Sequence, residues 1–282
     1  MTTGAYAEVI GDPIRQSKSP AIHGYWLDAL GLAGHYRATH VTADGLAAFL
    51  AERRGDPAWR GCNVTMPHKQ AVIAGLDRLD PLAAQVGAVN TIVPEAGGLA
   101  GYNTDVPGFL EPLRPWLQPV PRLNRALVIG TGGAARAIIL ALANAGLPLT
   151  VAGRDPAKAQ GLLDNLAPGT VHAVCNLAGI DPRRLGPATL VVNATALGMT
   201  GQPPLPFDPA AAPAGTVVYD IVTSPVETAL IAAARAAGHP VIDGLAMLIG
   251  QADHAFRRFF GANPPRGDAD GPLRARLTEV MA

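Results

Sequence analysis

The 282-residue sequence contains very little cysteine. Its two cysteines, Cys62 and Cys175, exclude a disulfide-rich scaffold, and their spacing is not that of a metal site. We expect both thiols to act as small buried hydrophobic side chains. Such sparse cysteine usage favours a reducing intracellular compartment, so we expect a cytoplasmic protein.

Charge and aromatic residues are also scarce. Lys and Arg number 22, Asp and Glu number 22, and the net charge is therefore zero. Because the chain lacks the basic surplus of nucleic-acid-binding or polybasic membrane proteins, we expect neither kind of partner. Charged residues make up 16% and aromatic residues 5%, while hydrophobic residues reach 49%, which is typical of a globular chain.

Long apolar runs are missing as well. Residues 1–9 have neither the basic region nor the apolar region of a secretory signal. The stretch most like a membrane span, residues 137–152, is interrupted by Asn144, Gly146 and Pro148. It also falls short of the roughly 20 apolar residues that a spanning helix needs. We therefore expect no membrane association.

Glycine and proline, in contrast, are abundant. The chain has 32 glycines and 26 prolines without a fixed period, which indicates many turns and close backbone contacts rather than collagen. At roughly 150 residues per domain, the length indicates two domains. Short apolar runs alternate with helical patterns, which is typical of an α/β protein with mostly parallel sheets. The expected strands are residues 7–10, 35–41, 61–64, 88–93, 126–129, 149–152, 190–193 and 217–221.

A change of domain is expected in the segment 111–125. Regular structure should be interrupted there by four prolines, Pro112, Pro115, Pro119 and Pro121. A further helix is expected from Asp243, and its periodicity leaves open which half of the chain it packs on.

A glycine-rich turn lies between the strand 126–129 and a helical pattern over 136–145. Its G-x-G-x-x-A pattern would use Gly130 for the tight turn, Gly132 for close approach of a pyrophosphate and Ala135 for helix–strand packing. The N–H groups at the start of the helix favour phosphates. The alternative is an ordinary turn between a strand and a helix, but the complete context favours a dinucleotide site.

The choice of dinucleotide depends on the end of the next strand. Arg154 stands 24 positions after Gly130, near the position about 20 residues on that contacts the ribose. An acidic residue there would accept from the 2′-hydroxyl of NAD, whereas arginine suits the 2′-phosphate of NADP. The adjacent Asp155 would repel a phosphate, although Asp155 before Pro156 also predicts a helix N-cap. We expect NADP, with NAD as the alternative.

Polar residues follow two early strands. Ser19 precedes a proline and is expected to cap a helix, and with Ser17 it could also hold a carboxylate at the helix N-terminus. Lys69 follows the strand 61–64, where open α/β sheets place ligands, although a solvated surface lysine is the simpler interpretation. A helix is expected to begin near Pro67.

Three further polar residues lie in this half. His68 is expected to pack or cap rather than act as a base, and Asn90 and Asp105 each suit a turn. The repetition of small polar groups beside glycines at several strand ends instead favours a pocket for a polyhydroxylated acid.

Together these motifs resemble the shikimate dehydrogenase family, including its quinate/shikimate relatives, from about residue 9 to residue 261. The matching segments, in the order and spacing of that family, are residues 17–23, 63–69, 87–91, 103–105, the Gly130 turn, 193–199, 220–228 and 247–251. The resemblance implies an oxidoreductase of aromatic amino acid (chorismate) biosynthesis. Such enzymes pass a hydride between NADP(H) and the 3-dehydroshikimate/shikimate pair.

The resemblance also implies an α/β fold of two domains. An N-terminal open α/β substrate domain would comprise residues 1–110 and 243–282, because the C-terminal helix returns to it. A Rossmann-type NADP-binding domain would comprise residues 111–242. The protein would be a monomer or a homodimer without a metal, and its partner would be a hydroxylated ring carboxylate.

Roles for individual residues follow from the same resemblance. Ser17 and Ser19 would bind the substrate carboxylate, and the ring hydroxyls would be bound by Thr65, Asn90, Asp105 and Gln251. The cofactor would be bound by Gly130, Gly132, Gly133, Ala134, Arg154, Thr195, Met199, Ile221 and Gly244. Lys69 and Asp105 would form the catalytic pair. Because a lysine with its ordinary pKa of about 10.4 is a poor base at neutral pH, we expect Lys69 to polarise the carbonyl and donate the proton. Asp105 would orient the hydroxyl.

The chain departs from the family pattern at three positions. Gly24 replaces an asparagine, Thr223 a tyrosine and Ala246 a glycine. Because that tyrosine lies near the substrate in the family, a related ring acid such as quinate or aminoshikimate is an alternative substrate. A non-catalytic ligand sensor is a second alternative, and a methylene-tetrahydrofolate dehydrogenase is a third, which the paired serines disfavour.

Overall fold

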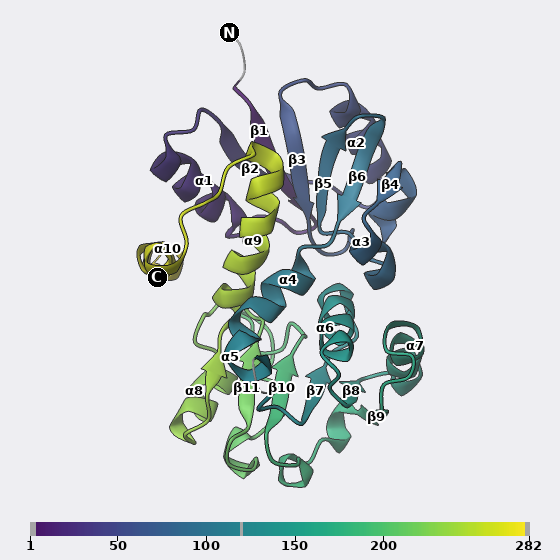
Figure 1. Cartoon of the computed structure of the whole chain (residues 1–282), viewed down its shortest axis with the longest axis vertical. Helices are drawn as coiled ribbons and strands as arrows, with labels where there is room; N and C mark the ends of the chain where they lie inside the picture. The colour runs from purple at the N-terminus through teal and green to yellow at the C-terminus, as the bar shows by residue number, and fades with distance from the viewer. Residues whose placement is uncertain (1–3, 119–120, 280–282) are drawn as a thin grey trace. The chain divides into compact units, whose positions relative to one another are not determined.

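The computed structural model describes residues 4–118 and 121–279, and it divides into two compact units. The first unit ends at Thr104 and resumes at Gln251, and the second runs from Asp105 to Gly250. The sequence placed these changes near residues 110 and 243. Helix α4 (Asp105–Leu110) groups with the second unit because it packs on α6 (Gly133–Asn144). Figure 1 shows the chain from its N-terminus to its C-terminus.

The proline-rich segment does contain regular structure, contrary to expectation. It forms η2 (Glu111–Leu113) and α5 (Arg114–Leu117), and each has a proline in its first turn. Proline is tolerated there because the first amides of a helix have no intrahelical partner. Pro119 lies outside the described residues.

The first unit contains a six-stranded sheet of order β2-β1-β3-β5-β6-β4. Its strands are β1 (Tyr6–Gly11), β2 (His35–His40), β3 (Trp59–Val64), β4 (Arg78–Leu79), β5 (Thr91–Glu95) and β6 (Gly98–Tyr102). Its helices are α1 (Ser19–Leu30), α2 (Leu46–Arg54), η1 (Ala71–Gly75), α3 (Pro81–Val86), the end of α9 (Gly244–Phe260), η6 (Gly267–Ala269) and α10 (Asp270–Glu279).

Strand β5 runs antiparallel to β3 and β6, while the other pairs are parallel. The beginning of β5 therefore lies at the same edge of the sheet as the carboxyl ends of β1, β3 and β6. The turns that follow those three strands meet the segment that precedes β5 at this edge.

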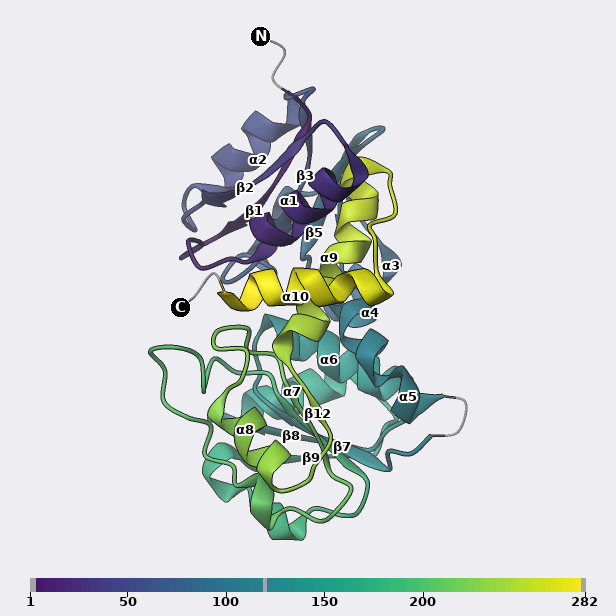
Figure 2. The ribbon, with the colours of Figure 1, turned by 90° about the vertical axis from the view of Figure 1, so that its left-hand side faces the viewer.

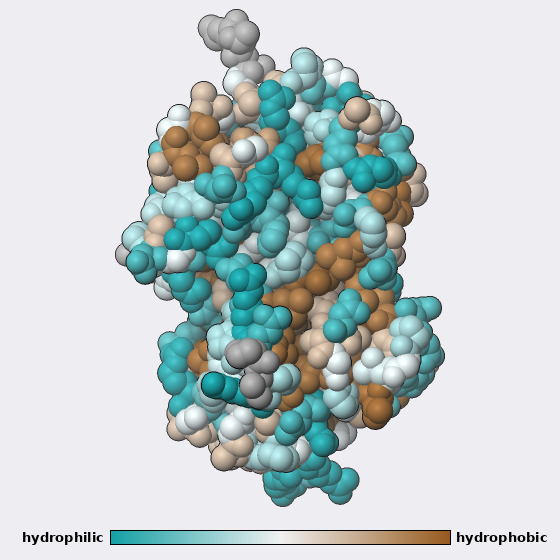
Figure 3. Space-filling view, viewed as in Figure 1, coloured by the Kyte–Doolittle hydropathy of each residue, from teal (hydrophilic) through white to brown (hydrophobic). Residues whose placement is uncertain are grey.

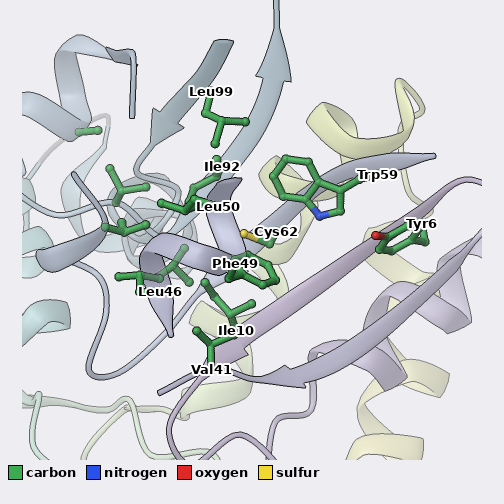
Figure 4. Close-up of a cluster of buried hydrophobic side chains, with 14 residues drawn as sticks. Tyr6, Ile10, Val41, Leu46, Phe49, Leu50, Trp59, Cys62, Ile92 and Leu99 are labelled. Carbon is green, nitrogen blue, oxygen red and sulfur yellow. The ribbon is translucent and has the colours of Figure 1, made fainter. Parts of the chain in front are cut away.

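Alternation along β1 gives the first unit two apolar layers. Tyr6 and Ile10 face a cluster that includes Trp59, labelled in Figure 4. Ala7 and Val9 face the opposite layer, to which α9 contributes side chains. Successive strand residues point to opposite faces, so one strand supports both layers.

The second unit contains six parallel strands in the order β12-β11-β10-β7-β8-β9. They are β7 (Arg125–Ile129), β8 (Leu149–Gly153), β9 (His172–Asn176), β10 (Thr189–Asn193), β11 (Val217–Asp220) and β12 (Val241–Ile242). The connecting helices are α6, α7 (Pro156–Leu166), η3 (Leu177–Gly179), η4 (Pro182–Arg184), η5 (Pro209–Ala211) and α8 (Ala229–Ala236). This is the Rossmann order, and it reverses between β7 and β10, where such sheets bind dinucleotides.

The expected α/β class with mostly parallel sheets is confirmed, with local corrections. The strand expected at 88–93 begins only at Thr91. No helix starts near Pro67, because residues 66–70 form turns and η1 begins at Ala71. Four strands were not anticipated, because they are short, glycine-rich or only half-buried: β4, β6, β9 and β12.

Within the described residues, no helix is long and apolar enough to cross a membrane. Large hydrophobic side chains that the structure exposes include Leu30, Leu32, Met66 and Val171. On the face drawn in Figure 3, hydrophilic and hydrophobic residues are interspersed.

Candidate functional site

Two serines lie in the turn that joins β1 to α1. Ser19 is the first residue of α1, which corrects the N-cap role that the sequence predicts for it. Lys18 holds the N-cap position, and no side chain caps the helix in the usual way. Instead, the amide of Ser19 donates to Ser17 Oγ at 3.3 Å. A hydroxyl that accepts can still donate, so the turn presents hydroxyl donors beside a helix N-terminus.

The loop after β3 brings Thr65 and Lys69 to the same edge of the sheet. The amide of Thr65 donates to the carbonyl of Ile10 at 2.9 Å, and the carbonyl of Lys69 accepts from the amide of Val89 at 2.7 Å. Lys69 is half-buried rather than fully solvated. The packing role expected for His68 is confirmed, since its buried ring contacts the carbonyl of Val41 at 2.6 Å.

A buried polar cluster forms where Asn90, Thr104 and Gln251 converge. Asn90 Oδ1 accepts from the amide of Thr104 at 2.7 Å, and Asn90 Nδ2 donates to Thr104 Oγ1 at 2.9 Å. Gln251 Oε1 lies 3.4 Å from both Asn90 Nδ2 and Thr104 Oγ1. These two contacts are long compared with ordinary hydrogen bonds. Gln251 Oε1 thus joins the Asn90–Thr104 pair through two long contacts.

The cluster continues into the sheet through residues for which the sequence predicted no role. Asn63 Nδ2 donates to Thr91 Oγ1 at 3.1 Å and to the carbonyl of Asn90 at 3.2 Å. Tyr36 donates to Asn63 Oδ1 at 2.7 Å and stacks on His23 with ring centroids 4.0 Å apart. Burial lowers the pKa of His23 to about 3, so its ring is neutral. Asn63 and His23 lie in the segments 63–69 and 17–23 that match the family, but that match assigned them no role.

Asp105 is buried and opens α4, directly after Thr104 in the chain. It is the first residue of the second unit, whereas the other residues expected to bind substrate, and the other expected catalytic residue, belong to the first. Those are Ser17, Ser19, Thr65, Lys69, Asn90 and Gln251.

The glycine-rich turn after β7 has the form expected of a dinucleotide site. Gly130 has φ of 126°, and a Cβ there would lie 2.7 Å from the carbonyl oxygen of Ala194. Gly132 is the N-cap of α6 without a side-chain cap, and a Cβ there would meet nothing within 4 Å. Gly133 and Ala134 form the first turn of α6, and Ala135 is fully buried against the sheet. Open space before an uncapped helix N-terminus fits the diphosphate of a dinucleotide.

Arg154 follows β8 and is exposed. The neighbouring Asp155 caps α7, because its Oδ1 accepts from the amide of Lys158 at 3.1 Å and Pro156 occupies the first turn. The capping alternative for Asp155 is thus confirmed, and its carboxylate is engaged by α7.

A second buried polar network links the ends of β10 and β11. Asn193 Nδ2 donates to Asp220 Oδ1 at 2.9 Å, and Thr228 Oγ1 donates to Asp220 Oδ2 at 2.7 Å. Burial raises the pKa of Asp220, and these donors partly oppose that shift. Asn193 Oδ1 in turn accepts from Thr195 Oγ1 at 2.7 Å. The sequence suggested no role for Asp220, although a carboxylate at the end of an apolar strand was a visible signal.

The remaining residues expected to bind the cofactor lie on the loops after β10 and β11 and at the start of α9. Thr195 and Met199 belong to the loop after β10, and Ile221 follows β11 with its amide donating to the carbonyl of Asn193 at 3.1 Å. Gly244 begins α9, and a Cβ there would lie 2.2 Å from the carbonyl oxygen of Val222. Gly244 thus lets α9 start directly against the loop after β11.

Two of the departures from the family pattern lie in different surroundings. A Cβ at Gly24 meets nothing within 4 Å, and Thr223 is half-buried in the loop after β11. Within residues 4–118 and 121–279, no group of three or more His, Cys, Asp or Glu residues could hold a metal ion.

Comparisons with known proteins point in one direction. A model of the shikimate dehydrogenase substrate binding domain matches residues 9–92. The NADP(+) shikimate dehydrogenase of Sphingopyxis alaskensis is 52% identical over 275 residues, which are 96% of each chain. The shikimate 5-dehydrogenase of Thermus thermophilus, in complex with NADP(H) and shikimate, is 35% identical with a TM-score of 0.82 and covers 99% of this chain and 100% of its own. The quinate dehydrogenase of Corynebacterium glutamicum, in complex with NAD, is 34% identical with a TM-score of 0.81 and covers 98% of each chain.

Proposed function

The chain belongs to the shikimate dehydrogenase family, and from that membership we propose that it interconverts 3-dehydroshikimate and shikimate with NADP(H). The observation that carries the proposal is the buried cluster of Asn90, Thr104 and Gln251, which lies at the same sheet edge as the serine turn and the Lys69 loop. NADP(H), when bound, supplies or accepts the hydride. Binding of the substrate, orientation of its ring and transfer of the proton would be performed by side chains of this protein.

The first unit would bind the ring acid. The hydroxyls of Ser17 and Ser19, with the positive end of α1, suit a carboxylate. Asn90 and Gln251 offer both amide donors and carbonyl acceptors to ring hydroxyls, and Thr65 offers a hydroxyl at the same edge. The oxygen of Gln251 lies 3.4 Å from both Asn90 Nδ2 and Thr104 Oγ1, so it stands beside the groups that would bind the ring hydroxyls.

Lys69 and Asp105 would manage the proton. In the direction of ketone reduction, the carbonyl carbon gains a hydride and the carbonyl oxygen gains a proton from the ammonium of Lys69. In the reverse direction, the same nitrogen takes the hydroxyl proton as the C–H bond breaks. The carboxylate of Asp105 would accept a hydrogen bond from the substrate and fix the hydroxyl in position.

The second unit would bind NADP. Gly132, Gly133 and Ala134 offer the amides of the α6 N-terminus to the diphosphate, and Arg154 offers a planar cation to the 2′-phosphate. The loops that carry Thr195, Met199, Ile221 and Gly244 would complete the site. Asp155 caps α7, so this carboxylate has a structural role apart from accepting the 2′-hydroxyl of NAD.

A substrate panel tests the proposal. Shikimate, quinate and aminoshikimate are each offered with NADP+ and with NAD+, and the absorbance of the reduced nicotinamide is followed. We expect the largest kcat/KM for shikimate with NADP+. A larger kcat/KM for quinate with NAD+ would instead identify quinate as the substrate. Quinate is the main alternative because Thr223 replaces the tyrosine of the family pattern. Absence of turnover with every pair would favour a ligand sensor.

A further inference from the structure

Helix α10 is fastened at both ends to segments that carry the proposed substrate site. Near its C-terminus, Lys18 Nζ donates to the carbonyl oxygen of Leu277 at 2.7 Å. Near its N-terminus, Arg266 Nε donates to Asp270 Oδ1 at 3.0 Å, and Arg266 Nη1 donates to Asp253 Oδ2 at 2.8 Å. All these residues belong to the first unit.

The lysine end reaches the serine turn. Lys18 stands between Ser17 and Ser19, and its own carbonyl accepts the amides of Ala21 and Ile22 in the first turn of α1 at 3.1 and 3.2 Å. Its ammonium points to α10 instead, where a cation at the last carbonyls of a helix is favourable. Lys18 is half-buried, and burial lowers its pKa. One residue therefore begins α1 with its backbone and caps α10 with its side chain.

The arginine end reaches the helix that carries Gln251. Asp253 lies two residues after Gln251 on α9, and its side chain is only 10% exposed. Arg266 joins this carboxylate to Asp270, the first residue of α10, and its own side chain is 18% exposed. Partly buried charge pairs of this kind hold a defined geometry better than exposed ones.

Packing keeps α10 rigid between its two ends. Leu273 and Leu277 are at most 1% exposed, and α10 packs on α1. Figure 2 shows α10 in yellow beside α1. A helix of ten residues is about 15 Å long, and it adds a second connection to the direct contact that Trp26 of α1 makes with Phe256 of α9.

We propose that α10 is a strut that sets the spacing between the serine turn and Gln251, and that Lys18 is its positioning residue. This inference rests on the proposed function, because it assigns the serine turn to the substrate carboxylate and Gln251 to a ring hydroxyl. Lys18 acts on the substrate through α10 and does not itself bind the carboxylate.

The test compares Lys18→Met, which keeps the aliphatic stem, with Lys18→Arg, which keeps the cation. Arg276→Met is the matched control, because Arg276 is an exposed cation in the last turn of α10. Hydrogen exchange is measured by mass spectrometry on the free full-length variants, over residues 270–278 and 14–22. Steady-state kinetics then give KM for shikimate, KM for NADP+ and kcat.

For Lys18→Met we expect faster exchange in both segments and a KM for shikimate raised about tenfold, as for a lost charge-assisted hydrogen bond. KM for NADP+ should be unchanged in Lys18→Met. Lys18→Arg should keep exchange rates and a KM for shikimate close to those of the wild type, and Arg276→Met should behave as the wild type. A raised KM with unchanged exchange in α10 would mean that Lys18 binds the carboxylate directly, which overturns the proposal. Faster exchange with an unchanged KM would also overturn it.

The exchange measurement needs no substrate, so it separates this proposal from the function on which it rests. If the wild type failed to oxidise shikimate while Lys18→Met still loosened both segments together, the proposed function would be wrong and the coupling of α10 to the turn would stand.

Discussion

The two units offer different groups to the ligands proposed for them. In the first unit, buried side chains such as Asn90 and Gln251 bond to one another at one edge of a mixed sheet. In the second, glycines clear space in front of the amides of α6, and side chains such as Asn193 and Asp220 bond mainly to hold the loops. A ring acid with several hydroxyls requires specific donors and acceptors, whereas a diphosphate requires backbone amides and room. Substitutions in the first unit should therefore change kcat or the KM for the ring acid. Substitutions in the second unit should change the affinity for the cofactor or the geometry of the loops.

The largest effect should come from the first unit. Lys69→Met removes the proposed proton donor, and kcat should fall by about a hundredfold to ten-thousandfold, the usual contribution of a positioned acid or base. The dissociation constant for NADP+, measured by fluorescence titration, should be unchanged. If the Lys69→Met enzyme stayed active, Lys69 would not be the proton donor. The proposed difference between a unit that performs the chemistry and a unit that binds the cofactor would then be wrong.

A smaller effect is expected at the exposed cation of the second unit. Arg154→Ala should raise KM for NADP+ by about tenfold to a hundredfold, because a charge-assisted hydrogen bond to the 2′-phosphate is lost. KM for NAD+ should hardly change. Arg122→Ala, another exposed arginine of the same unit, is the control. Equal losses with both cofactors would refute the contact with the 2′-phosphate.

Removal of the central amide of the first unit should affect both stability and substrate binding. Asn90→Ala leaves the amide of Thr104 and its hydroxyl without the partners that Asn90 supplies, at a cost of about 1–3 kcal/mol in the free energy of unfolding. Urea denaturation measures this cost, and KM for shikimate should rise in parallel. Asn165→Ala, an exposed amide on α7, should change neither. A stable variant with unchanged KM would show that the cluster is dispensable.

The smallest effect is expected for Asp220→Asn, and it should depend on pH. Because burial raises the pKa of Asp220 in the folded protein, protonation favours folding, and this contribution is lost as pH rises through the folded pKa. The asparagine lacks that dependence, so wild type should gain stability relative to the variant as pH falls toward 3.8. At pH 7 the two should differ by less than about 1 kcal/mol, since an amide can still bond Asn193 and Thr228. Urea denaturation between pH 4 and pH 7 provides the comparison, and parallel curves would contradict it.

In each unit the sequence predicts four of the six strands, and in the second it also identifies the turn at Gly130. In the second unit, the continuous apolar strands and the turn at Gly130 each give a local sequence pattern, so the Rossmann sheet and its turn could be recognised from the sequence. In the first unit, the antiparallel β5 and the glycine-rich β6 depend on pairing between strands, which periodicity does not encode. The N-cap predicted at Ser19 was wrong for a related reason, because Lys18 takes that position while its side chain is held by a helix about 260 residues later in the chain.

The sequence identifies candidate site residues one by one, but it does not show which of them form hydrogen bonds with one another. Asn90 was identifiable from its motif, whereas its bonds to Thr104 and Gln251 join positions up to 161 residues apart. Asn63 and Tyr36 were missed because a polar residue in a strand gives no local sign of what it faces. Such contacts arise only when the sheet has assembled.

Helix α9 limits how one unit of this protein can be exchanged for that of a relative. It begins at Gly244 against the loop after β11, and two turns later it presents Gln251 to the cluster around Asn90. One continuous helix thus supplies residues to both units, and the boundary between them at Gly250 falls inside α9. A chimera that exchanges the second unit with that of a relative must keep this helix in register with both parents. The inheritable module is consequently the second unit together with a matched α9, not the stretch of chain from 105 to 250 alone.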